Sequence, residues 1–178
     1  MTQSDIKKIV ENLIQTFLDA GKISIDLRKK GLTKEIKSDN TPVSNGDLEV
    51  NKILSKKILS LTPNIPIVSE ETSENKSKNN LENFWLIDPI DGTYDYINDL
   101  DEFTINAGLI IQKKPVAGLI YAPAKNRMFY SYGDDFSFEL INGEPIKLDN
   151  SKNFDKNEIK FVSSVSYTHL TLPTTGVV

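Results

Sequence analysis

Apolar residues near the amino terminus recur at intervals of three and four positions. This spacing places them on one face of an amphipathic helix, which we expect to reach about Leu27 and to be broken at Gly31. A second helix is predicted after Ser44 or Asn45, since either residue can cap it. The apolar residues expected to face inward are Ile6, Ile9, Val10, Leu13, Ile14, Phe17 and Leu18 in the first helix, and Leu48, Ile53, Leu54 and Ile58 in the second.

The rest of the chain has the short apolar runs that are typical of β-strands. Two of these runs lead directly into acidic residues, the first into Glu70 and the second into Asp88. A strand meander with a tight turn at Asn142-Gly143 is expected after them. The predicted strands are 33–37, 65–68, 84–87, 103–111, 116–122, 127–132 and 136–141, with a turn at 39–42 and an exposed loop at 73–80. Helices followed by such a meander predict an α+β fold, with helices packed on a largely antiparallel sheet.

The composition of the chain limits the kinds of functional site that it can form. The chain has no cysteine and one histidine, His169, which excludes disulfides, zinc–thiolate sites and thiol nucleophiles and argues against a Ser-His-Asp triad. A bound metal would therefore need oxygen ligands, which favours a hard cation such as magnesium, manganese or calcium. The net charge of −4 argues against a nucleic-acid partner. No apolar run approaches the ~18 residues of a membrane span, and the start lacks a signal peptide, so we expect a cytoplasmic protein.

The string WLIDPIDGT is the strongest chemical signal. A buried strand leads into two carboxylates three residues apart, Asp88 and Asp91, around a proline that we expect to end the strand. Both acids and the Ile90 carbonyl can then converge on one point. Gly92 lets the backbone approach a ligand, and a helix starting near Thr93 would turn its free amides toward an anion. The string favours a metal–phosphate site over an acidic turn with no ligand, and its spacing excludes an EF-hand.

Two further acidic segments are ambiguous on the residues alone. Glu70 and Glu71 follow an apolar strand, and because adjacent side chains alternate in extended chain, only one of them can reach a shared metal. Such a pair is otherwise a solvated surface pair. Asp47 lies near the start of the second predicted helix, where a carboxylate can serve simply as a helix cap.

Three strings in this order, KSDNTPVSNGD, LTPNIPIVSEE and WLIDPIDGT, resemble the inositol monophosphatase superfamily. The continuation DEFTINAGLIIQKKPVAGLIYAPAKNRMFY is most similar to 3'(2'),5'-bisphosphate nucleotidases of the CysQ type. The resemblance runs from about residue 37 to residue 164. It implies the layered sugar-phosphatase fold, with residues 1–165 as its amino-terminal metal- and phosphate-binding domain.

The resemblance also implies an activity and a site. The activity is magnesium-dependent hydrolysis of 3'-phosphoadenosine 5'-phosphate, a small phosphorylated substrate, to AMP and phosphate by water that the metal activates. Asp47 and Thr93 would position and activate that water, and the amides of Gly92 and Thr93 would hold the phosphate. The implied metal ligands, which also contact the substrate, are Glu70, Asp88, Asp91 and the Ile90 carbonyl. The alternatives are an inositol or sugar monophosphatase of the same superfamily, and an inactive metal-binding fragment.

The sequence departs from the family in two places, and its last residues have an unusual composition. The family continues into a second, α/β domain with a W-D motif whose aspartate is a further metal ligand, whereas this chain has only Trp85. Tyr94-Asp95-Tyr96 stands where the nucleotidases commonly read K-E-F. Residues 166–178, SYTHLTLPTTGVV, contain no Asp, Glu, Lys or Arg, which favours a non-native tail over a natural carboxy-terminal strand. The sequence leaves the oligomeric state open.

Overall fold

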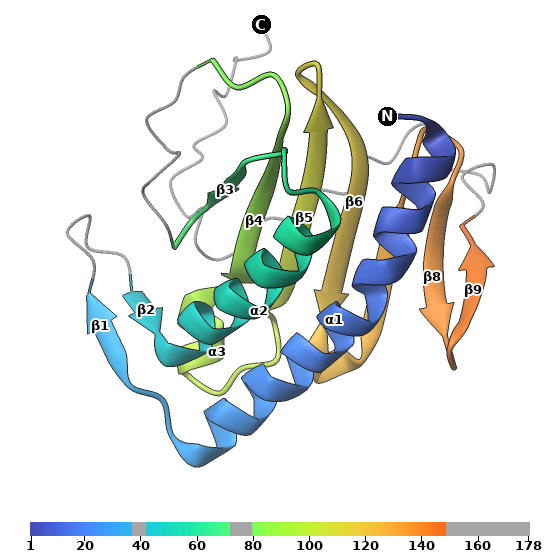
Figure 1. Ribbon diagram of the computed structural model, residues 1–178. Coiled ribbons are helices and arrows are strands. Elements are labelled where there is room, and N and C mark those ends of the chain that lie inside the picture. The colour runs from blue at the N-terminus through green and yellow to red at the C-terminus, as the bar shows by residue number, and fades with distance from the viewer. Residues whose placement is uncertain (37–41, 72–79, 149–178) are drawn as a thin grey trace, which may run out of the picture.

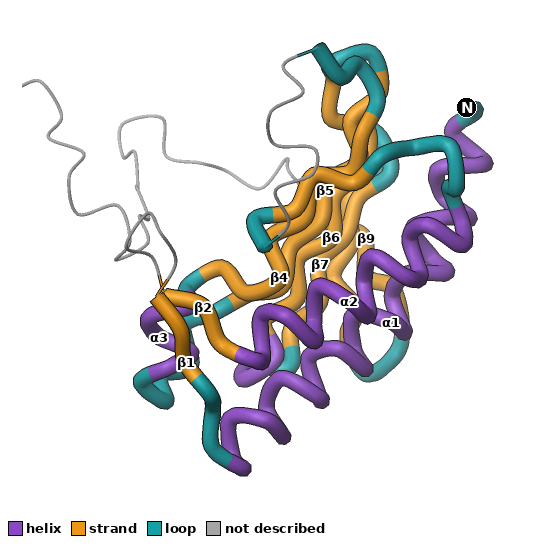
Figure 2. The backbone as a smooth tube through the Cα atoms, turned by 60° about the vertical axis from the view of Figure 1, so that its left-hand side comes forward, coloured by secondary structure: helices purple, strands orange, loops and turns teal. Residues whose placement is uncertain are grey.

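Two helices lie side by side across one face of a twisted sheet in the computed structural model (Figures 1 and 2). The structure describes residues 1–36, 42–71 and 80–148. The elements, in chain order, are α1 (Gln3–Lys30), β1 (Lys34–Ile36), β2 (Pro42–Ser44), α2 (Asn45–Leu61), β3 (Ile67–Ser69), β4 (Phe84–Asp91), α3 (Thr93–Ile97), β5 (Thr104–Ile111), β6 (Lys114–Ala122), the 3-10 turn η1 (Pro123–Lys125), β7 (Arg127–Ser131), β8 (Ser137–Ile141) and β9 (Glu144–Lys147). The predicted α+β class is confirmed.

The described strands of the main sheet follow one another in sequence order from β3 to β9. The β3–β4 pair is parallel and every later pair is antiparallel, as the strand meander predicted. The predicted hairpin at Asn142-Gly143 joins β8 to β9. Its two residues have φ values of 53° and 83°, the left-handed backbone that two-residue hairpin turns require.

The core lies between the helices and the sheet. Helix α1 buries Val10, Leu13 and Phe17, and α2 buries Val50, Leu54 and Ile58, against a sheet face that includes Trp85 and Leu109. The prediction that Leu48 faces inward is wrong, because its side chain is 50% exposed. The first turns of α2 instead bury two polar side chains, Asp47 and Asn51, beside Gly46 and Val50. A polar buried face at the start of this helix is the first structural sign of a functional site.

The helix ends agree closely with the sequence. Thr2 and Asp5 form a reciprocal capping box at the start of α1, and Gly31, with a φ of 97°, ends the helix as predicted. Helix α1 extends past the expected end at Leu27 to Lys30. Ser44, one of the two predicted caps, is the N-cap of α2.

The structure corrects two strand predictions. Pro89 does not end its strand, because β4 continues to Asp91 through an irregularity in its pairing with β5. Pro42 begins β2 rather than closing a turn. The predicted turn at 39–41, most of the predicted loop at 73–80, and the predicted tail at 166–178 with His169 lie outside the described residues. Among the described residues, every helix is too short or too polar to cross a membrane.

Candidate active site

A β-bulge in β4 brings Asp88 and Asp91 to the same side of the sheet. Asp88 is paired with Asn106 and Asp91 with Thr104, so three steps along β4 match two steps along β5. In a regular strand, residues three apart point to opposite faces, and the extra residue in the bulge removes this alternation. Pro89 lies inside the bulge, where the lack of an N–H breaks no regular ladder bond.

Asp47 is fully buried at the start of α2 and has two kinds of hydrogen-bond partner. Its Oδ2 accepts from the backbone N of Ser44 at 2.9 Å and from Ser44 Oγ at 2.6 Å, which completes a capping box. Its Oδ1 accepts from Thr93 Oγ1 at 3.1 Å. The carboxylate therefore caps the helix and also contacts Thr93, the residue predicted to act with it, while the catalytic role of the pair stays a prediction.

Thr93 connects α2 to the end of β4. Its Oγ1 lies 3.1 Å from Asp47 Oδ1 and 2.9 Å from the Ile90 carbonyl oxygen. A hydroxyl has one hydrogen, so it donates to one of these acceptors at a time. Burial raises the pKa of Asp47 above its usual value, against the opposing effect of the hydrogen bonds from Ser44 and Thr93. Asp47 is thus a stronger proton acceptor than an exposed aspartate.

Glu70 reaches the site from the neighbouring parallel strand. Ser69 pairs with Ile87, and the Glu70 amide donates to the Ile87 carbonyl at 3.1 Å, so Glu70 follows β3 beside the position of Asp88 on β4. The strand end is fixed to α2, because Ser69 Oγ donates to Asn51 Oδ1 at 2.7 Å. Asp47 and Asn51, one turn apart on α2, therefore hold the ends of two different strands.

Asp88 lies among these acidic groups, and the charges that act most strongly on it within the described residues are negative. Burial, followed by the charges of Glu70 and Asp91, raises the pKa of Asp88 to about 8. Its Oδ1 is buried and accepts no hydrogen bond within the described part of the chain. An oxygen-only donor set with an unsatisfied buried acceptor fits a hard cation.

The acidic side chains do not yet form a closed cage. No three or more of the acidic and histidine side chains in residues 1–36, 42–71 and 80–148 gather closely enough to hold an ion as they stand. Hydrogen bonds bring together Asp47, Thr93 and the Ile90 carbonyl, and electrostatic interaction links Asp88 to Glu70 and Asp91. The assignment of a metal to these residues therefore stays a prediction.

Aromatic packing fixes the turn from β4 into the short helix α3. Tyr96 is fully buried, its hydroxyl donates to the Ser24 carbonyl of α1 at 2.7 Å, and its ring occupies the space where Gly46 of α2 has no side chain. Gly92 has a φ of 87°, and a Cβ there would lie 2.8 Å from the Glu102 carbonyl oxygen. Gly92 is thus required by the chain's own backbone, besides any approach to a ligand.

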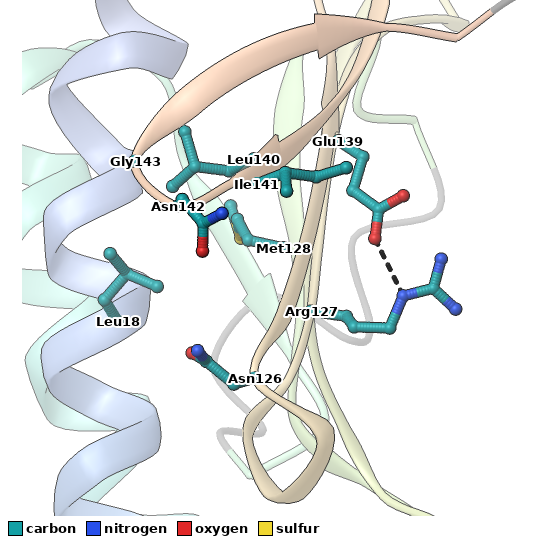
Figure 3. A pocket seen from close by; sticks show the side chains of 9 residues that line it. All are labelled: Leu18, Asn126, Arg127, Met128, Glu139, Leu140, Ile141, Asn142 and Gly143. Atoms are coloured by element: carbon teal, nitrogen blue, oxygen red, sulfur yellow. Dashed lines mark hydrogen bonds and ion pairs between the residues drawn. The ribbon is translucent and has the colours of Figure 1, made fainter.

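A pocket of about 390 Å³ lies elsewhere, between α1 and the β8–β9 turn (Figure 3). Its two charged lining residues, Arg127 and Glu139, pair at 2.7 Å, and this hydrogen bond holds the pKa of Glu139 below its usual value. Glu139 on β8 lies four strand spacings from Asp88 on β4, which at about 4.8 Å per spacing is roughly 19 Å. The pocket includes none of the predicted site residues.

Sequence reasoning did not identify Ser44, Asn51 and Asn106 as site residues. Ser44 and Asn51 hold Asp47 and the end of β3, and Asn106 Nδ2 donates to Asp91 Oδ2 at 3.4 Å. The signal for Asn106 was available, because it is a polar residue inside the apolar strand segment TINAGLII.

Comparison of the chain with known proteins identifies its relatives. A profile of the inositol monophosphatase family matches residues 5–176. The 3'(2'),5'-bisphosphate nucleotidase CysQ of Haemophilus influenzae is 36% identical over 140 residues, which cover 77% of this chain and 52% of the relative. The CysQ protein of Buchnera aphidicola is 34% identical over 72% of this chain and 50% of the relative.

A solved structure supports the fold. The extragenic suppressor protein SuhB from Bartonella henselae has a TM-score of 0.66 at 23% identity, covering 74% of this chain and 52% of that chain. At this identity the likeness concerns the fold alone. The chain spans about half the length of the curated relatives it matches.

Proposed function

The chain belongs to the inositol monophosphatase family, and we propose that it supplies the metal- and phosphate-binding part of a magnesium-dependent phosphomonoesterase. The supporting observation is the link in which Thr93 Oγ1 lies between Asp47 Oδ1 and the Ile90 carbonyl, next to Asp88 and Asp91. A buried carboxylate that contacts a hydroxyl beside further acids is suited to hydrolysis, since it can take up a proton from a nearby water.

The proposed ligands of the cation are Glu70, Asp88, Asp91 and the Ile90 carbonyl oxygen. Their fit rests on an all-oxygen donor set and on the buried, unpaired Oδ1 of Asp88. When bound, Mg²⁺ would offset the mutual repulsion of the acids and stabilise negative charge on a phosphoryl group.

The proposed proton route uses Thr93 and Asp47. When the Thr93 hydroxyl donates to Asp47 Oδ1, its oxygen lone pairs are free to accept a hydrogen bond from a water. As that water attacks phosphorus, its proton passes to Thr93 Oγ1, and the original hydroxyl proton passes to Asp47. The raised pKa of Asp47 favours this transfer. Ser44, bonded to the other carboxylate oxygen, keeps Oδ1 turned toward Thr93.

The proposed phosphate contacts are the backbone amides of Gly92 and Thr93, where β4 ends and α3 begins. Gly92 adopts a left-handed backbone conformation, and successive amides in such a turn can point toward a common anion. Tyr96 and the β-bulge hold this turn between α1, α2 and the sheet.

The substrate we propose is 3'-phosphoadenosine 5'-phosphate, which would be cleaved to AMP and phosphate. The support is that the curated relatives at 36% and 34% identity are named 3'(2'),5'-bisphosphate nucleotidases. Hydrolysis of an inositol or sugar monophosphate is the second candidate, favoured by the family profile.

A panel of phosphate-release assays tests both candidates. The substrates are 3'-phosphoadenosine 5'-phosphate, inositol 1-phosphate and a sugar phosphate, each with and without MgCl₂. Because the chain spans about half of its relatives, the assay uses both this chain and the gene product encoded at its genomic locus. Magnesium-dependent release from the bisphosphate alone supports the nucleotidase, and release from inositol phosphate alone supports the second candidate. No release from any of them by the gene product would contradict the proposed class.

A further inference from the structure

Asn106 lies on β5 directly opposite Asp88, facing the two acids of the β4 bulge. Its Nδ2 donates to Asp91 Oδ2 at 3.4 Å, a long hydrogen bond. Its side chain therefore reaches diagonally from the position of one acid to the other. None of the residues assigned above to metal, water or phosphate lies on β5.

The carbonyl end of the same side chain is unsatisfied. In the described part of the chain, the buried side-chain oxygens without a partner are Asp88 Oδ1 and Asn106 Oδ1. An unpaired buried acceptor destabilises a fold, so two of them on directly paired residues call for an explanation. Two acceptor oxygens cannot satisfy each other without a hydrogen or a cation between them. A donor or a cation between the strands would satisfy both.

From this arrangement we propose that Asn106 is a positioning residue of the cation site. Its Nδ2 holds the Asp91 carboxylate in place, and its Oδ1 would accept a hydrogen bond from a water molecule that a bound Mg²⁺ keeps. This ion characteristically keeps several of its waters when a protein binds it, so nearby neutral acceptors are useful to it. The inference rests on the proposed function, because it assumes the cation.

A role of Asn106 in packing alone and a role at the cation site predict different effects of its replacement. On this face of the sheet the next residue across from Asn106 is Ile120, which is 49% exposed, so the position demands no polar side chain for packing. Valine fits a strand well and carries no unpaired oxygen. If Asn106 serves the cation, Asn106→Val should leave the metal-free protein as stable as the wild type or more so, while weakening its response to magnesium.

The experiment compares wild type, Asn106→Val and the neighbouring control Ile120→Val in thermal melts over a series of MgCl₂ concentrations. The fluorescence of Trp85, the chain's one tryptophan, reports unfolding. Loss of a residue that orients metal ligands typically weakens metal affinity about 10- to 100-fold. We expect the MgCl₂ concentration for half-maximal stabilisation to rise by that factor in Asn106→Val and to stay unchanged in Ile120→Val. Binding of Mn²⁺ followed by electron paramagnetic resonance should show the same ratio.

Each outcome decides one question. A wild type with no response to magnesium overturns the proposed cation site, and this inference with it. If the wild type responds to magnesium and Asn106→Val has the same half-maximal MgCl₂ concentration, the inference alone is overturned, whatever the stability of the metal-free variant. If Asn106→Val does not fold, Asn106→Asp decides. A fourth acid beside the cation should lower the metal-free melting temperature and enlarge its rise with magnesium, and an unenlarged rise refutes the role.

Discussion

Replacing Asp88 by asparagine should make the stability of the metal-free protein less dependent on pH. Burial and the neighbouring acids raise the pKa of Asp88 to about 8 in the folded chain, against about 3.9 for an aspartate in an unfolded one. Between these values the folded state keeps a proton that the unfolded state has released. Wild-type stability should therefore fall as pH rises from about 4 to about 8, and level off above that. Asparagine has no such proton to lose.

The size of the effect follows from proton linkage. One proton of difference between the two states changes the unfolding free energy by about 1.4 kcal/mol per pH unit at most. Asp88 is half-buried, and solvent screens part of its charge, so we expect a total loss of roughly 1–2 kcal/mol between about pH 5 and about pH 7.5. For a chain of this length, about 1 kcal/mol corresponds to a melting-temperature change of about 2–4 °C.

The assay is urea unfolding of the metal-free protein at several pH values, followed by Trp85 fluorescence. The informative quantity is the difference between wild type and Asp88→Asn, because other carboxylates titrate in both proteins. Asp134→Asn, at an exposed position, controls for the loss of an acid as such. At about pH 8, MgCl₂ should stabilise the wild type and have little effect on Asp88→Asn. Parallel pH profiles for the two proteins would refute the reasoning about Asp88.

Three further substitutions test other parts of the site. Asp47→Asn in the active gene product should lower turnover about 10²- to 10⁴-fold, with the magnesium-induced rise in melting temperature retained; unchanged phosphate release would leave Asp47 as a helix cap only. Gly46→Ala places a Cβ against the Tyr96 hydroxyl, so urea unfolding should show a loss of about 1–3 kcal/mol, whereas the control Gly118→Ala, with its nearest neighbour at 3.6 Å, should not reproduce that loss. Tyr96→Phe leaves the buried Ser24 carbonyl without its donor and should cost about 1 kcal/mol, and a neutral result would show that water replaces the hydroxyl.

Local sequence was sufficient for most of the elements. The helix α1, its end at Gly31, the cap at Ser44 and the hairpin at Asn142-Gly143 follow from side-chain spacing and backbone preferences, which act over a few residues. Each of these features depends on residues that are close together in the chain, so the sequence alone predicts it. The same is true of the acidic string after Trp85, whose residue types and spacing indicate a functional segment.

Predictions from local sequence were wrong at two positions where elements meet, Leu48 and Pro89. Leu48 is apolar and is predicted to lie inside, yet the helix buries Asp47 and Asn51, which bond Thr93 at the start of α3 and Ser69 at the end of β3. Pro89 was expected to end its strand, yet β4 continues, because a bulge opposite β5 accommodates a residue without an N–H.

The sequence by itself determined which functional groups are available: oxygen ligands, two acids around Pro89, a hydroxyl at Thr93 and helices to hold them. Only the tertiary structure decided which groups meet. Strand register places Asp88 opposite Asn106, the bulge turns Asp91 to the same face, and α2 brings Asp47 to Thr93 from 46 positions away. Such pairings are set by long-range packing and by the one register that buries the apolar face of the sheet, which no short segment of sequence specifies.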